Sequence, residues 1–218
     1  MSTSHRPVPP RRGFLAQLAA VGAALGVPAL AHAHGSEGAP SGADEPWLAR
    51  LTGRHRVIIH AHEPADGLAM GWARNFLDAQ RDAYRLTDRD STVVIGLQGK
   101  ALALLYGDAM WAKYDMAGAL GFAAGSSNPF AAPADARPAR PTSVAALQAR
   151  GVIFLACGNS LRMGAQRWVR ETPVTAERMT AWADEARANL LPGVEVVPAL
   201  ITTLVMAQER GCRYVYAG

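Results

Sequence analysis

The stretch Val152-Ile153-Phe154-Leu155-Ala156-Cys157-Gly158-Asn159-Ser160 decides the fold. It is a short, unbroken apolar run that passes directly into a cysteine, a glycine and two polar residues. An apolar run of this length, bounded by turn residues, is typical of a strand that is buried on both faces. Strands of that kind belong to parallel sheets covered by helices, so we expect strands and helices to alternate on either side of it.

The same kind of apolar run occurs at four other places in the chain, at residues 56–62, 92–97, 194–197 and 213–216. Segments with helical spacing or helix-start signals separate the runs, at residues 68–86, 99–106, 108–120, 143–150, 161–168, 175–190 and 198–210. Asp66 is placed to cap the first of these helices. The alternation predicts an α/β fold, an open doubly wound parallel sheet of about five strands with helices on both faces. Ligands of such sheets bind at the carboxyl ends of the strands.

The N-terminal residues 1–33 have the three parts of an export signal. Arg11-Arg12 comes just before an apolar run, and the run is followed by the small-residue cleavage site Ala31-His32-Ala33. The paired arginine with Phe14-Leu15 behind it indicates the twin-arginine route. We therefore expect a periplasmic protein that is cleaved after Ala33 and keeps no stable membrane span.

The charge of the chain excludes one class of partner. The whole chain has 22 Lys and Arg against 18 Asp and Glu, a net charge of +4. The export signal holds three of the arginines and no acidic residue, so 19 basic and 18 acidic residues remain. This nearly neutral remainder has no basic cluster, and we expect no nucleic-acid partner.

The two cysteines of the chain, Cys157 and Cys212, are too few for a disulfide scaffold. They either form one bridge or stay free thiols.

The sequence behind the signal divides into a leader and one domain. Residues 34–52 are rich in Gly, Ser, Ala and Pro at first and predict a flexible leader, in which Trp47 to Leu51 is expected to form a short helix packed on the body. Residues 53–218 form the α/β domain. Within it, residues 121–142 predict an inserted loop, and loops of that length are either lids and interface elements or disordered segments.

Cys157 is the sharpest candidate for chemistry. It lies where the third strand ends and a helix begins, so helix N-terminal amides are expected to favour its thiolate. Gly158 permits a tight turn, Asn159 or Ser160 is able to cap the helix, and Arg162 adds positive charge one turn later. The alternative is that Cys157 is a small buried hydrophobe beneath the turn.

Three blocks of sequence resemble the DsrE/DsrF-like (YchN-like) family, and together they place the resemblance over residues 55–218: Leu147 to Leu161, Leu191 to Pro198, and Gln208 to Tyr214. The block Asp108 to Tyr114 is similar to an exported subgroup of that family. The resemblance implies a small α/β domain that assembles into trimers or hexamers. It also implies that Cys157 carries persulfide sulfur between a donor and an acceptor, with a sulfurtransferase-like activity if the chain is an enzyme.

Two further features keep a rival function open. His60 and His62 lie two apart on a strand, so both side chains face one way, and imidazole suits copper or zinc. This pattern fits a non-enzymatic periplasmic binding or assembly module. Lys113, beside Tyr114, is either an anion-binding group, for instance for a sulfur oxyanion, or a solvated surface residue. In the sulfur-carrier interpretation, Lys113, Asn159 and Arg162 are the helpers of Cys157.

Overall fold

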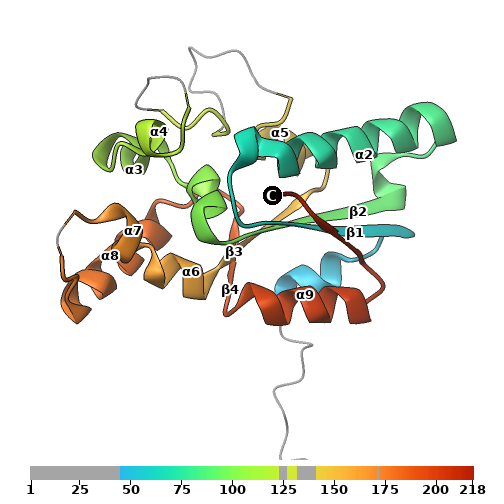
Figure 1. Ribbon diagram of the computed structural model, residues 1–218. Coiled ribbons are helices and arrows are strands. Elements are labelled where there is room, and N and C mark those ends of the chain that lie inside the picture. The colour runs from blue at the N-terminus through green and yellow to red at the C-terminus, as the bar shows by residue number, and fades with distance from the viewer. Residues whose placement is uncertain (1–44, 123–126, 132–140, 171) are drawn as a thin grey trace, which may run out of the picture. The chain divides into compact units, whose positions relative to one another are not determined.

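The computed structural model describes residues 45–122, 127–131, 141–170 and 172–218 (Figure 1). Its centre is a five-stranded sheet with the order β4-β3-β2-β1-β5, in which every neighbouring pair is parallel. The strands are β1 His55–Ala61, β2 Ser91–Leu97, β3 Ile153–Cys157, β4 Glu195–Val197 and β5 Arg213–Tyr216. The predicted fold class and all five predicted strands are confirmed.

Helices cover both faces of this sheet (Figure 1). The α-helices are α2 Leu68–Tyr84, α3 Asp108–Lys113, α4 Met116–Ala119, α5 Val144–Ala149, α6 Gly158–Met163, α7 Ala165–Trp168, α8 Ala176–Ala188 and α9 Leu200–Glu209. The 3-10 helices are η2 Pro46–Arg50, η3 Ala65–Gly67, η4 Asp88–Asp90 and η5 Gly99–Leu105. One apolar cluster joins α2 to α8 with one face of the sheet, and a second joins η2 and α9 with the other face.

The strand order explains why most of the helices lie on one face of the sheet and only η2 and α9 on the other. From β1 to β4 each crossover steps in the same direction, and right-handed crossovers then put all their helices on one face. The chain finally steps back from β4 to the far side of β1, so α9 lies on the opposite face. The chain therefore leaves the adjacent ends of β3 and β4 toward opposite faces. This is the switch point at which a crevice forms in an open α/β sheet.

The folded domain already includes η2, although the leader was expected to extend to residue 52 and the domain to begin at residue 53. Trp47 and Leu48 in η2 are almost completely buried against α9 and the sheet, as the expected short helix requires. An ion pair between Arg50 and Glu195 also ties η2 to β4. The export signal at residues 1–33 and the first part of the leader lie outside the described residues.

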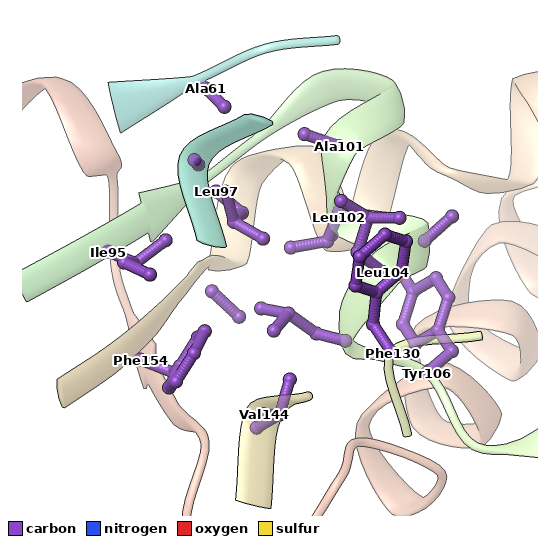
Figure 2. Close-up of a cluster of buried hydrophobic side chains, with 14 of the residues drawn as sticks. Ala61, Ile95, Leu97, Ala101, Leu102, Leu104, Tyr106, Phe130, Val144 and Phe154 are labelled. Carbon is purple, nitrogen blue, oxygen red and sulfur yellow. The ribbon is translucent and has the colours of Figure 1, made fainter. Parts of the chain in front are cut away.

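The inserted loop at residues 121–142 contains a buried anchor. The Asn128 side-chain amide donates to the carbonyl oxygens of Leu104 and Tyr106 at 2.9 and 2.8 Å, and its Oδ1 accepts the Phe130 N–H at 2.8 Å. Figure 2 shows Phe130 among the apolar side chains of the larger cluster. Asn128 and Phe130 are thus part of the core, while residues 123–126 and 132–140 lie outside the described residues.

The two predicted helix caps are wrong. Asp66 does not cap α2, because residues 65–67 form the 3-10 turn η3 and Gly67, with φ +75°, precedes the helix. Gly67 is needed there since an added Cβ would lie 2.2 Å from the Phe130 ring. Asn159 and Ser160 do not cap α6 either, because this helix begins at Gly158, directly after β3, and both residues lie inside it.

No helix among the described residues combines the length and apolar character that crossing a bilayer requires.

Candidate functional site

A crevice of about 510 Å³ lies at the switch point, where the carboxyl ends of β3 and β4 separate. Its lining comes from the start of α6, the end of α8 and the end of β4: Gly158, Asn159, Arg162, Arg187, Val196 and Pro198. The sequence-predicted residues Asn159 and Arg162 therefore meet here. They lie at the edge of the sheet where a parallel α/β fold places its ligands.

Gly158 permits the close approach that shapes the floor of this crevice. A Cβ built on Gly158 would lie 2.9 Å from the carbonyl oxygen of Val197 and 3.3 Å from that of Pro198. A larger residue at position 158 would push the end of β4 and the following Pro198 away from α6. The glycine after the third strand thus serves the packing between β3 and β4.

The crevice is positively charged. The Arg162 guanidinium donates to the Asn159 side-chain oxygen, which holds the two residues together one turn apart on α6. Arg187, from the last turn of α8, faces the same space. No carboxylate lines the crevice, and neither arginine has an ion pair within the part of the chain that the structure describes. The guanidinium groups are therefore available to an anionic ligand.

Cys157 lies beneath this edge and is almost completely buried, with 3% of its surface exposed. Its Sγ accepts the backbone N–H of Leu200 at 3.4 Å, at the start of α9. The helix amide that contacts the thiol thus comes from α9 and not, as expected, from α6. Cys157 and Cys212 are both free thiols in the apolar cluster on the α9 face. Burial raises the pKa of Cys212.

Lys113 does not join the other predicted site residues. Its Nζ lies 2.6 Å from a carboxylate oxygen of Glu185, and the Tyr114 hydroxyl donates to the second oxygen at 2.8 Å. The hydrogen bond to Glu185 raises the pKa of Lys113. Lys113 therefore links α3 to α8 and is absent from the lining of the crevice.

His60 and His62 occupy different surroundings at the end of β1. His60 is buried; its Nε2 lies 2.9 Å from the Gln98 side-chain nitrogen and its Nδ1 lies 3.0 Å from the Tyr214 hydroxyl. Both ring nitrogens of His60 therefore have a hydrogen-bond partner. His62 is half-exposed and contacts Glu63 at 3.4 Å. The described residues contain no group of three or more His, Cys, Asp or Glu arranged to hold a metal ion.

The buried His60 gives a testable pH dependence. Burial lowers the pKa of His60 from its usual value of 6.5, and His62 lowers it further. The unfolded state then binds the proton more readily, so the stability from neutral His60 is present above pH 6.5 and is lost as the pH falls through the folded-state pKa. Urea unfolding of wild type and His60→Gln at pH 7.5 and pH 5 should show the larger loss in wild type. Equal losses in both proteins would contradict this assignment.

A larger cleft of about 880 Å³ lies at the opposite, amino edge of the sheet. Its lining includes Arg50, Arg89 and Arg150. Arg150 already bridges Asp78 and Asp88, and Arg50 pairs with Glu195, so most of the positive charge of this cleft is neutralised. The smaller crevice at the carboxyl edge is therefore the better candidate for a charged ligand.

Arg187 is the site residue that sequence reasoning missed. It stands in the last turn of the helix that leads from β3 back to β4, and such a turn is usually solvated. The available signal was topological, because a helix that connects two neighbouring strands must pass close to the crevice between them. That signal needs the strand order, which the sequence pattern alone does not provide.

Comparisons with known proteins give a structural likeness without a function. No family model and no curated protein matches the chain. A solved structure, that of the protein of unknown function MTH1491 from Methanobacterium thermoautotrophicum, is similar at 17% sequence identity and a TM-score of 0.42. The likeness covers 74% of this chain and 98% of that protein.

Proposed function

We propose that this protein binds a small anion in the crevice between the ends of β3 and β4. The observation that carries the proposal is the pair of guanidinium groups, Arg162 and Arg187, in a crevice whose described lining residues include no carboxylate. Guanidinium is planar, always charged and presents several N–H donors, which match the oxygens of an oxyanion. Asn159 holds Arg162 in place and so fixes the direction of its donors.

Sulfur oxyanions are the class of ligand that we propose. The family resemblance around Cys157 implies sulfur chemistry, and the arginine pair supplies the positive charge that thiosulfate or sulfite requires. In this function the protein is a binding module, and Cys157 packs between β3 and α9.

The test is a calorimetric titration of the full chain with thiosulfate, sulfate and phosphate. A charge-assisted hydrogen bond contributes about 1.5–3 kcal/mol, so Arg162→Ala and Arg187→Ala should each weaken binding about 10- to 100-fold. Arg89→Ala is the matched control, because Arg89 is an exposed arginine that lines the cleft at the amino ends of the strands. Equal weakening by Arg89→Ala, or no binding by wild type, would refute the crevice as the site.

A second candidate function is persulfide transfer through Cys157. One observation favours it: the Leu200 N–H, at the start of the ten-residue helix α9, points at Sγ and would stabilise negative charge on sulfur. In the proposed step the Cys157 thiolate attacks the outer sulfur of thiosulfate. The S–S bond of thiosulfate breaks, sulfite leaves with the electron pair, and Cys157 keeps the transferred sulfur as a persulfide.

Intact mass measurement after incubation with thiosulfate tests this step. We expect a gain of one sulfur in wild type and in Cys212→Ser, but none in Cys157→Ser. Because Cys157 is buried, the gain should be faster in urea just below the unfolding transition, where we expect local opening to expose the thiol. An unchanged wild-type mass under both conditions would exclude the transfer function and leave the binding function in place.

The compartment and the assembly complete the proposal. We propose that the paired arginines of residues 1–33 direct the folded chain to the periplasm, and that the chain forms a trimer or hexamer, as the family resemblance implies. Cell fractionation and sedimentation equilibrium test these two statements separately.

A further inference from the structure

Apolar side chains are exposed along β5, the outer strand of the sheet next to β1. Eight large hydrophobic side chains among the described residues are exposed. Tyr84 is the last residue of α2 and Met163 lies on α6; the other six come from β5, from the first part of α2 or from α9: Leu68, Trp72, Ile201, Val205, Tyr214 and Tyr216. Tyr214 and Tyr216 come from β5 itself, at 44% and 51% exposure. Large apolar patches on a protein surface mark interaction sites.

The helix residues of this set face β5 because of their position on each helix. On α2, Asp78 lies on the flank that contacts Arg150 next to α5, and Trp72 lies on the opposite flank, toward β5. On α9, Met206 packs in the cluster that contains η2, whereas Ile201 and Val205 lie on the other flank. Apolar side chains therefore border β5 on both faces of the sheet.

Within the described residues, the backbone of β5 has hydrogen-bonding groups without a partner at this edge. Ala217 donates its N–H to the His60 carbonyl of β1 at 2.8 Å, so Val215 and Arg213 also face β1. The N–H and C=O groups of Tyr214 and Tyr216 then point away from the sheet, because backbone direction alternates along a strand. An open edge of this kind is ready to pair with another strand.

We propose that this edge binds a second copy of the same chain, through antiparallel pairing of two β5 strands about a two-fold axis at Val215. In this register Tyr214 of one copy lies opposite Tyr216 of the other, and the outward N–H and C=O groups of both residues pair across the axis. The tyrosine rings stack across the strands on the α9 face. Pairing in this register joins two five-stranded sheets into one.

Charge complementarity favours a second copy in this register. Arg213, at the start of β5, would lie opposite Ala217 of the other copy. At that end of the strand Glu63 is close, because its backbone N–H donates to the Gly218 carbonyl at 3.1 Å. Within its own copy the half-exposed Glu63 carboxylate contacts Lys100 at 3.1 Å and His62 at 3.4 Å, and in the dimer it would also meet Arg213 of the other copy, twice across the two-fold axis. This surface lies along β5, the outer strand on one side of the sheet, whereas the anion crevice lies beside β4, the outer strand on the other side. The failure of either proposal therefore leaves the other unaffected.

Cross-linking through one introduced cysteine tests the register. Val215→Cys places two thiols directly opposite each other in a non-hydrogen-bonded pair, where the Cβ–Cβ distance suits a disulfide. We expect this variant of the full chain to form a covalent dimer under mild oxidation. Met163→Cys, exposed on α6 beside β3, is the matched control and should stay uncross-linked. Both natural cysteines are buried and should not interfere.

Charge reversal in sedimentation equilibrium tests the same contact without a cross-link. Arg213→Glu and Glu63→Arg should each weaken self-association at least about tenfold, since like charges then face each other, and the double variant should restore it. A wild-type dimer or hexamer that responds in this way supports the proposal. A monomer, a trimer, or an oligomer unaffected by these changes would overturn it.

Discussion

Replacing Trp182 with alanine is expected to lower the free energy of unfolding by about 3–5 kcal/mol. The Trp182 ring is 1% exposed and packs edge-to-face on Tyr106 and Tyr114. Its Nε1 also donates to the Leu161 carbonyl at 2.9 Å, so alanine leaves a cavity and removes one of the two hydrogen bonds to that oxygen, which keeps the Gly164 N–H at 3.2 Å. The measurement is urea unfolding followed by circular dichroism.

The same substitution should weaken anion binding, because Trp182 fixes α8 against α6. Arg187 is carried by α8 and Arg162 by α6, so a loose contact between the helices changes the distance between the two guanidinium groups. Trp182→Phe is the matched control: it keeps most of the ring packing, loses only the N–H donor, and should show a smaller loss in both measurements. A loss below about 1 kcal/mol for Trp182→Ala would contradict the packing described for α8.

Replacing Asn128 with alanine is the second change with a large expected effect. It removes the three hydrogen bonds that this fully buried side chain makes with the carbonyl oxygens of Leu104 and Tyr106 and with the Phe130 N–H. An unsatisfied buried polar group costs about 1–3 kcal/mol, so we expect a total loss of about 2–4 kcal/mol. Urea unfolding measures the loss.

Limited proteolysis then shows whether Asn128 anchors its loop. Cleavage between residues 121 and 142 should become faster in Asn128→Ala than in wild type, because Phe130 loses the backbone contact that keeps it in the core. Asn128→Asp is the control that retains an acceptor for the Phe130 N–H but lacks the two donors. Cleavage at the wild-type rate in Asn128→Ala would show that Phe130 packing alone holds the segment.

The fold was predictable because its signals are local. Each strand is a short apolar run, as in Val152 to Ala156, and the helices between the runs begin or end at turn residues such as Gly151 and Gly211. The failed cap at Asp66 shows the limit of local signals, since the turn before α2 is shaped by Phe130 from a distant part of the chain.

The site was predictable only in part, because its chemistry depends on distant contacts. The sequence brings Asn159 and Arg162 together, since they lie one turn apart after β3. It does not reveal that the partner of Cys157 is the N–H of Leu200, or that Lys113 is held by Glu185. Nor does it reveal Arg187, which reaches the crevice through the strand order.

Nuclear magnetic resonance during a thiosulfate titration tests the central claim, anion binding at the β3–β4 crevice, most directly. We predict saturable shifts of the Gly158 and Asn159 backbone amides and of the Arg162 and Arg187 side-chain N–H signals, while the Arg89 side-chain signal stays unchanged. Shifts confined to the cleft that contains Arg89, or no saturable shift at the crevice, would contradict the claim.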